Sequence, residues 1–270
     1  MLKVDFSEDI RSYLGQLKDA SIKDISQDTL NAIILGQKAI GKTQMICESA
    51  RRPVLIHSFD PGGTKHMKPE IERGEVIVDS RFEFDDARKP TAYDLWEKEF
   101  DKMLKMNFFE HVGTYVIDSF THWLRSMYHK VAKTKFANDG VLEIKGWAII
   151  TNALQSMTRL GTALPCDFLL TGHLTRDKEE FTGRFMELFA APPSCQVTIP
   201  SLFDEYYVMR LDPKDDGRRV LQTANTSTAV AGARVGRGKF SLYEEPDLRK
   251  LKEKAGLDIT DRPYPLFERD

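Results

Sequence analysis

The sequence predicts an α/β fold with a mainly parallel central sheet flanked by helices and extended by C-terminal antiparallel strands. Short apolar runs alternate with helical patterns as far as residue 171, and this alternation is typical of a parallel sheet with helical crossovers. The pattern then becomes a series of strand-like runs, "CQVTI", "EYYVMRL", "RRVLQT" and "KFSLY". Such a series favours antiparallel strands added to the parallel sheet.

The composition is that of a globular protein, with 41% hydrophobic and 30% charged residues. At 270 residues the chain is long enough to bury a substantial core, as one large domain or two small ones. No apolar run approaches the roughly 20 residues that span a bilayer, and the first residues lack the apolar core of a signal peptide. We therefore expect no membrane partner.

The cysteines indicate the redox compartment of the protein, and the net charge limits its possible contacts with nucleic acid. Cys47, Cys166 and Cys195 form no C-x-x-C pair, so we expect reduced thiols in the cytoplasm rather than disulfides or a zinc site. The net charge of −2 excludes a protein that is basic overall. Any contact with nucleic acid would therefore come from local clusters or from assembly of several subunits.

The elements follow in order along the chain. Residues 1–30 are expected to form a small N-terminal cap, with a helix near 7–18 begun by Ser7 and Glu8. Residues 31–243 would form the core, and 244–270 a C-terminal tail. In the core, apolar runs predict strands at 31–35, 53–58, 75–79, 114–117 and 167–171. Helices are expected at 43–51, 91–107, 121–132 and 145–160; the second is amphipathic, with Leu95, Phe100 and Leu104 on one side.

The stretch "ILGQKAIGKTQM", residues 34–45, contains the pattern G-x-x-x-x-G-K-[ST]. Such a loop turns at its glycines and aims backbone N–H groups at phosphates. The strand before it and the helix after it supply the required context, because a helix N-terminus attracts anions. The alternative is an ordinary glycine-containing turn between a strand and a helix. The loop comprises Gly36, Gln37, Lys38, Ala39, Ile40, Gly41, Lys42, Thr43 and Gln44.

Individual roles within this loop follow from the chemistry of the side chains. Lys42 would carry the positive charge for the β- and γ-phosphates of a bound nucleotide, and we expect it to be exposed in the empty loop. Thr43 would offer its hydroxyl to Mg²⁺. A metal partner is expected at the end of a neighbouring apolar strand, and "YVIDS" places Asp118 there. Asp118 could instead end its strand and cap the next helix.

Two further side chains follow apolar strands. Asp60 ends the strand after the phosphate-loop helix and is a candidate for orienting the attacking water. Asp60 could equally belong to a simple turn, Asp60-Pro61-Gly62-Gly63. His173 follows "DFLLT" and could sense the γ-phosphate, or be a partly buried structural histidine. The other histidines show no metal-ligand spacing, so no site is assigned to His57, His66, His111, His122 or His129.

The motifs "GQKAIGKT", "LIHSFDPGG", "YVIDSFTHW", "FLLTGH", "SLFDEYYVMRL" and "VLQTANTSTAVAGARVGRG" together resemble the RecA-like ATPases of bacteriophages. In particular, they are similar to the nucleotide-binding proteins that include the Sak-type single-strand annealing recombinases. The resemblance covers roughly residues 30–240. It implies a RecA-like P-loop core, ATP and Mg²⁺ as cofactors, and a location in the host cytoplasm.

The resemblance also implies roles for single residues. Asp118 would hold Mg²⁺ through water, and His173 would couple nucleotide state to DNA. Asp60 falls where RecA-like proteins usually carry a catalytic Glu, and its shorter side chain puts fast hydrolysis in doubt. The late basic motif of the family corresponds to Arg234 with Arg237 nearby. One of them would reach the γ-phosphate of a neighbouring subunit, within a ring or filament.

Two segments are candidates for contact with single-stranded DNA. The first follows the helix after Asp118, and the second follows His173. Both interleave basic and aromatic residues, which suits phosphate attraction and base stacking. The alternative is a solvated charged surface, favoured in the second segment by its acidic residues. The basic candidates are Lys130, Lys133, Lys135, Arg176, Lys178 and Arg184.

Three functions remain open from the sequence. The first is an ATPase that assembles on single-stranded DNA in phage recombination, annealing or replication, with a single-stranded-DNA-binding protein as a possible partner. The second is a nucleotide-switched adaptor with little turnover. The third is a P-loop kinase of a small molecule, disfavoured because the chain has no arginine-rich lid segment.

Overall fold

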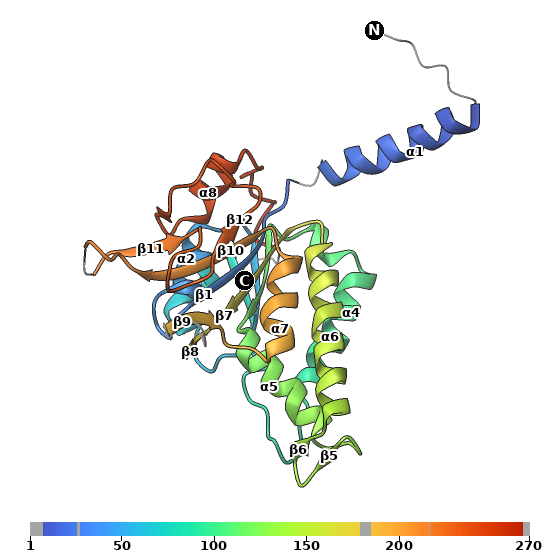
Figure 1. Ribbon diagram of the computed structural model, residues 1–270, viewed down its shortest axis with the longest axis vertical. Helices are drawn as coiled ribbons and strands as arrows, with labels where there is room; N and C mark the ends of the chain where they lie inside the picture. The colour runs from blue at the N-terminus through green and yellow to red at the C-terminus, as the bar shows by residue number, and fades with distance from the viewer. Residues whose placement is uncertain (1–7, 26–27, 179–184, 216, 267–270) are drawn as a thin grey trace.

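The computed structural model describes residues 8–25, 28–178, 185–215 and 217–266 (Figure 1). Within them, nine strands form one sheet in the order β13-β11-β10-β1-β7-β4-β2-β3, with β12 also paired to β10. The run from β10 to β3 is parallel, and β11, β12 and β13 join by antiparallel pairing. The predicted fold class is therefore confirmed.

The strands and helices have the following bounds. The parallel strands are β1 (Asn31–Gly36), β2 (Val54–Ser58), β3 (Val76–Asp79), β4 (Thr114–Asp118), β7 (Asp167–Gly172) and β10 (Glu205–Leu211); the others in the sheet are β11 (Arg219–Gln222), β12 (Gly232–Ala233) and β13 (Tyr243–Glu244). The helices are α1 (Glu8–Ile25), α2 (Lys42–Ser49), α3 (Lys68–Glu72), α4 (Ala92–Lys105), α5 (Phe120–Val131), α6 (Ile144–Thr162), α7 (Pro193–Thr198) and α8 (Leu248–Ala255). Two separate hairpins pair β5 (Ala137–Asn138) with β6 (Val141–Leu142) and β8 (Leu174–Lys178) with β9 (Phe185–Phe189).

Helices cover both faces of the sheet (Figure 1). Alternate residues of a strand point to opposite faces, so Ile33 and Leu35 of β1 pack into a core with α4, α5 and α6. Ala32 and Ile34 pack into a second core with α2 and α8. Because β1 is buried on both faces, its sequence is a continuous apolar run rather than an alternating one.

Large aromatic side chains fix α4 and α5 against the sheet. Trp96 of α4 meets Trp123 of α5 with ring centroids 4.9 Å apart and planes at 69°, an edge-to-face geometry that suits aromatic rings. Both indoles are fully buried. This packing holds the start of α5 at the end of β4, and so determines where the side chains of its first turn lie.

Two of the predicted strands are wrong. "CQVTI" lies in α7 and its C-cap, because Pro192 and Pro193 lead into a helix in which Cys195 is buried and Val197 is 74% exposed, and Ile199 at the C-cap is buried again. That i, i+4 burial is helical, whereas a strand would place all three side chains on one face. "KFSLY" contributes only its tyrosine to a strand, since the N–H groups of Lys239 and Phe240 donate to the carbonyl oxygen of Gly236 in a turn.

The two ends of the chain differ. The N-terminal helix is present as α1, which extends away from the sheet instead of covering it (Figure 1). The segment after residue 243 carries α8, which is anchored by a buried ion pair between Lys252 Nζ and Asp167 at 2.6 Å.

None of the helices in the described ranges is long and apolar enough to cross a membrane. All three cysteines are free and buried.

Candidate functional site

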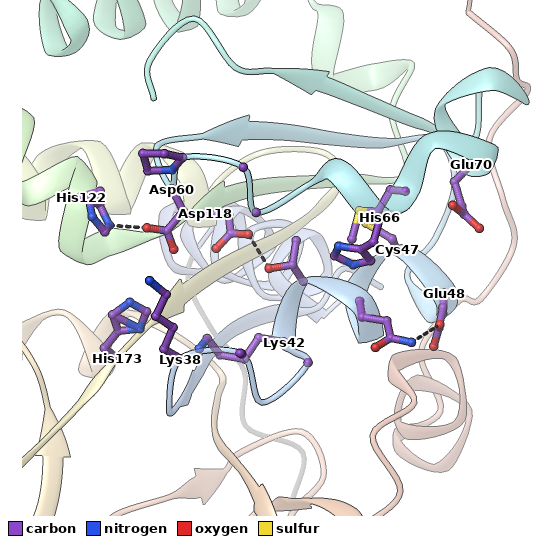
Figure 2. Close-up of a pocket in the computed structure, with 18 residues that line it drawn as sticks. Lys38, Lys42, Cys47, Glu48, Asp60, His66, Glu70, Asp118, His122 and His173 are labelled. Carbon is purple, nitrogen blue, oxygen red and sulfur yellow. Dashed lines mark hydrogen bonds and ion pairs between the residues drawn. The ribbon is translucent and has the colours of Figure 1, made fainter. Parts of the chain in front are cut away.

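The carboxyl ends of β1, β2, β4 and β7 surround one cavity of about 910 Å³ (Figure 2). Strand register brings these ends together, because Leu35 pairs with Gly172 and Ser58 pairs with Asp118. The residues that follow each strand therefore meet at one edge of the sheet, as expected for a ligand site of a parallel α/β sheet. The phosphate loop and Asp118 line this cavity together with Asp60 and His173.

The two glycines of the phosphate loop serve different purposes. A Cβ at Gly36 would lie 2.7 Å from the backbone oxygen of Met209, so Gly36 is required by the close approach of β10. Gly41 has φ +105° and precedes the first turn of α2, a conformation that side chains disfavour. Between them Ala39 also has a positive φ of 62°. The loop thus aims the N-terminus of α2 at the cavity.

Lys42 is not exposed, contrary to the expectation from the sequence. Only 7% of it is accessible, and its Nζ donates hydrogen bonds to the carbonyl oxygens of Gly36 at 3.1 Å and Gln37 at 3.0 Å. The ammonium folds back across its own loop because these carbonyls satisfy it there. Burial lowers the pKa of Lys42, opposed by the nearby carboxylates of Asp118 and Asp60.

Thr43 and Asp118 lie side by side. The Thr43 hydroxyl donates to Asp118 Oδ2 at 2.6 Å, and the Thr171 hydroxyl donates to Oδ1 at 2.5 Å. Asp118 is 2% exposed. Burial raises its pKa, although the hydrogen bonds from the two hydroxyl groups lower it in part. A hydroxyl and a carboxylate next to a phosphate loop are the oxygen donors that Mg²⁺ uses with nucleotides, so these residues fit that ion.

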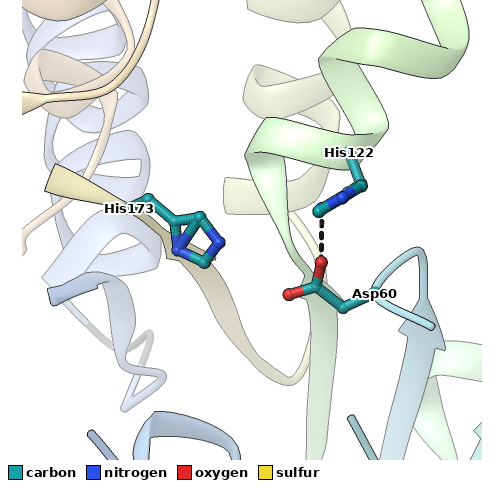
Figure 3. Close-up of side chains that lie close together, drawn as sticks. All are labelled: Asp60, His122 and His173. Carbon is teal, nitrogen blue, oxygen red and sulfur yellow. Dashed lines mark ion pairs between the residues drawn. The ribbon is translucent and has the colours of Figure 1, made fainter. Parts of the chain in front are cut away.

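Asp60 and His122 form an ion pair in the same cavity (Figure 3). The backbone N–H of Asp60 also donates to the carbonyl oxygen of Asp118 at 3.3 Å, which places Asp60 beside the carboxylate expected at the metal. Burial opposes ionisation of Asp60, but hydrogen bonding and charge from His122 keep its pKa below the usual value. The carboxylate is therefore ionised at neutral pH and available as a base or ligand.

His173 follows β7 and faces the same region (Figure 3). Its ring centroid lies 6.5 Å from that of His122, with the planes perpendicular. Burial lowers the pKa of His173, and the charge of Lys42 lowers it further. A neutral imidazole here has one N–H to donate and one nitrogen lone pair to offer.

Two residues at this site were missed in the sequence. His122 was assigned no role because its partners are distant along the chain and it has no ligand spacing. Arg219 lies on β11, and its guanidinium occupies the space a Cβ of Gly41 would need; it donates to Gln44 Oε1 at 3.0 Å. The "RRVLQT" run indicated only a strand, so nothing local pointed to either contact.

The proposed trans arginines lie elsewhere. Arg234 and Arg237 are exposed, and Arg234 Nη2 donates to the carbonyl oxygen of Ser201 at 3.1 Å. Arg234 follows β12, which pairs with Glu205 and Tyr206 at the start of β10. The phosphate loop follows Gly36, which pairs with Met209 near the other end of β10. Neither arginine lines the cavity of its own subunit.

Each of the two candidate DNA segments contains a hairpin. Lys133 and Lys135 are exposed between α5 and β5, whereas Lys130 is ion-paired with Asp94 at 2.6 Å and Glu97 at 3.4 Å. The β5–β6 hairpin lies between the C-terminal end of α5 and the N-terminal end of α6 (Figure 1).

The second hairpin, β8–β9, starts directly after His173. Arg176 and Lys178 are exposed on β8, and Phe185 on β9 is 65% exposed. Arg176 is 3.4 Å from Glu187 on the facing strand. The candidate Arg184 lies outside the described residues.

Comparison with known proteins gives a family match over most of the chain. Residues 28–235 match the AAA domain. Curated proteins give no match. Similar solved structures include a prototypical ATPase from the type III secretion system of pathogenic bacteria, at 13% identity and TM-score 0.42, covering 84% of this chain and 61% of that chain. They also include the assembled ATPase EscN from the type III secretion system of enteropathogenic E. coli, at 16% identity and TM-score 0.37, covering 67% of this chain and 43% of that chain.

Proposed function

Since this chain belongs to the AAA domain family and is a P-loop ATPase, we propose that it hydrolyses ATP while assembled on single-stranded DNA, in phage recombination, annealing or replication. The observation that carries the nucleotide part is the contact between Thr43 and Asp118 at the mouth of the phosphate loop. The DNA part rests on the resemblance to phage RecA-like ATPases and on the hairpin that adjoins His173.

The residues around the cavity would have different roles in ATP hydrolysis. Lys42 and the backbone N–H groups at the start of α2 would bind the phosphates. Thr43 would hold Mg²⁺ directly and Asp118 through water; the bound ion neutralises charge on the β- and γ-phosphates. Asp60 would orient the attacking water and accept its proton, because it is ionised and lies beside Asp118.

The coupling of ATP state to DNA would run through His173. The β8–β9 hairpin begins at the next residue, and its base is fixed by the N–H of Ala190, which donates to the carbonyl oxygen of His173 at 3.0 Å. Phe189 also packs against Phe120 at the start of α5, with ring centroids 4.7 Å apart. A shift of His173 toward a γ-phosphate would therefore move the hairpin. Its exposed Phe185 suits stacking on a base.

Self-association belongs to the same proposal. The arginines lie near the amino end of β10, and the cavity lies at the carboxyl end of β1. Because β1 and β10 are parallel, the two features are at opposite ends of the strands. If one subunit's arginine completes the next subunit's site, the contact is head to tail, and repeated head-to-tail contacts generate a ring or a filament.

The test is ATP hydrolysis with and without single-stranded DNA, using Phe185→Ser and Tyr264→Ser as a matched pair. Tyr264 is also a partly exposed aromatic (39%), but it lies near the amino end of β2, where the N–H of Arg262 donates to the carbonyl oxygen of Arg52. DNA should stimulate the wild type and Tyr264→Ser, and stimulate Phe185→Ser at least several-fold less. Tight ATP binding without turnover would favour the adaptor, and phosphate transfer to an acceptor would favour the kinase.

A further inference from the structure

Three side chains from separate elements converge on one point of the cavity (Figure 3). Asp60 follows β2, His122 lies in the first turn of α5, and His173 follows β7. A carboxylate oxygen and one nitrogen from each imidazole all lie within 4.8 Å of one another. Among the described residues, one group of three His, Cys, Asp or Glu side chains is compact enough to hold a metal ion, and it consists of these three residues.

The donor set indicates the class of ion. Two imidazoles and one carboxylate suit Zn²⁺ and related transition-metal ions, whereas Mg²⁺ prefers oxygen ligands in an octahedral arrangement. Bonds of roughly 2.0–2.2 Å to Zn²⁺ require the donors to move inward by about one ångström. Side-chain rotation supplies such a movement, because Asp60 and His122 are 27% and 35% exposed rather than locked in the core.

The surroundings leave donors available. The Nδ1 atom of His173 is buried and has no hydrogen-bond partner within the described part of the chain. The Asp60 carboxylate already contacts His122, and a nitrogen of His173 lies within 4.8 Å of both ligand atoms. The cavity beside them leaves room for water or another ligand on the ion.

We propose that Asp60, His122 and His173 form a binding site for a transition-metal ion of the zinc class, with three protein ligands and a further position open to the cavity. This site is separate from the oxygen pair of Thr43 and Asp118. Binding of the ion takes up the Asp60 carboxylate and therefore slows ATP hydrolysis. This consequence rests on the role proposed for Asp60 in hydrolysis, whereas the site itself rests only on the three side chains.

The first experiment measures binding without turnover. The full-length, nucleotide-free chain is titrated with Zn²⁺ by calorimetry and with Co²⁺ by visible absorption, which reports ligand geometry. We expect one ion per chain. Asp60→Ala, His122→Ala and His173→Ala should each weaken binding at least tenfold, with circular dichroism confirming the fold.

Two control variants share the cavity but not the site. His66 and Cys47 both line it, so His66→Ala and Cys47→Ser should bind the ion like the wild type. The proposal is overturned if the wild type binds no Zn²⁺ or Co²⁺, or if the three site variants bind as tightly as the wild type. It is also overturned if a control variant removes the binding.

The second experiment tests the consequence. ATP hydrolysis is measured at constant Mg²⁺–ATP while free Zn²⁺ is raised in a zinc-buffered solution. The rate should fall as the site fills, and the ratio of rates with and without Zn²⁺ should stay near one in His122→Ala. Unchanged wild-type hydrolysis with the site filled would overturn the inhibition and the role proposed for Asp60, but not the site. Failure of the wild type to bind Zn²⁺ or Co²⁺ in the first experiment would overturn the site alone.

Discussion

The hydroxyl of Thr43 donates a 2.6 Å hydrogen bond to the carboxylate of Asp118, although the two residues are 75 positions apart. The first stands at the start of α2 and the second at the end of β4. Their contact joins the two motifs that a phosphate-bound Mg²⁺ requires. It also defines what each neighbouring side chain should contribute, and the following predictions start from it.

Asp118→Asn should reduce Mg²⁺-dependent hydrolysis by about a hundredfold while changing ATP affinity less. The amide keeps the shape of the side chain but loses the negative charge that faces the metal, and the phosphates retain the loop N–H groups and Lys42. Hydrolysis and nucleotide binding should be measured across a Mg²⁺ titration. Unchanged turnover would assign Asp118 to strand ending and helix capping.

Lys42→Ala should abolish ATP binding or turnover and leave the fold intact. The lysine's hydrogen bonds in the structure go to carbonyl oxygens of its own loop, so its loss removes a charge rather than core packing. Lys68→Ala is the control, because the Lys68 side chain is 79% exposed and does not line the cavity. Fluorescent-nucleotide binding and thermal unfolding should be measured together, and wild-type affinity in Lys42→Ala would refute the phosphate-loop interpretation.

Arg234 and Arg237 should act on the neighbouring subunit. Both are exposed at the edge of the sheet opposite their own cavity, and a planar guanidinium suits phosphate oxygens. ATPase activity per subunit should therefore rise with protein concentration. An inactive Lys42 variant mixed with an inactive arginine variant should regain activity, because some interfaces join an intact loop to an intact arginine. Arginine variants with unaltered DNA-stimulated hydrolysis would leave these residues as solvated surface charges.

Lys252→Met should destabilise the protein by about 3–5 kcal/mol. Lys252 and Asp167 are nearly inaccessible, at 2% and 3% side-chain exposure, so the methionine leaves a buried carboxylate whose remaining partners are Arg51 at 3.7 Å and the N–H of Leu30. Lys250→Met is the matched control on the same helix, since the Lys250 side chain is 60% exposed. Denaturant unfolding should show a large loss for the first variant and a small one for the second. Equal losses would contradict the importance of the buried pair.

Stability should fall as the pH drops below about 6.5, partly through His57. Full burial lowers the pKa of His57 to about 4, against an ordinary value of 6.5, so in this interval the unfolded chain binds a proton that the folded chain does not. The free energy of unfolding therefore decreases on acidification, with a share of about 3 kcal/mol from this group by pH 4.

His57→Gln is the variant that checks this share. Its free energy of unfolding should depend less steeply on pH between 6.5 and 4 than that of the wild type, measured by urea denaturation. His111→Gln, at an exposed position, should keep the wild-type slope. A slope in His57→Gln as steep as in the wild type would show that other groups cause the acid sensitivity.

Local patterns in the sequence predicted the parallel strands and the phosphate loop. Continuous apolar runs identify strands buried on both faces, so β1, β2, β4 and β7 were predicted within one residue of their observed bounds. The spacing of Gly36, Gly41, Lys42 and Thr43 is itself the phosphate-loop signal. Both patterns lie within a few consecutive residues, so they can be recognised without knowing the tertiary structure.

Only the tertiary structure decided which distant side chains meet. His122 reaches Asp60 because aromatic packing holds α5 against β4, and Arg219 covers Gly41 because β11 pairs beside β10. Likewise, α7 is a helix because one of its faces had a core to cover. The sequence alone determined the strands and the nucleotide loop, since these depend on local periodicity and backbone freedom. The partners of that loop depend on strand order and register, which bring together residues far apart in the chain.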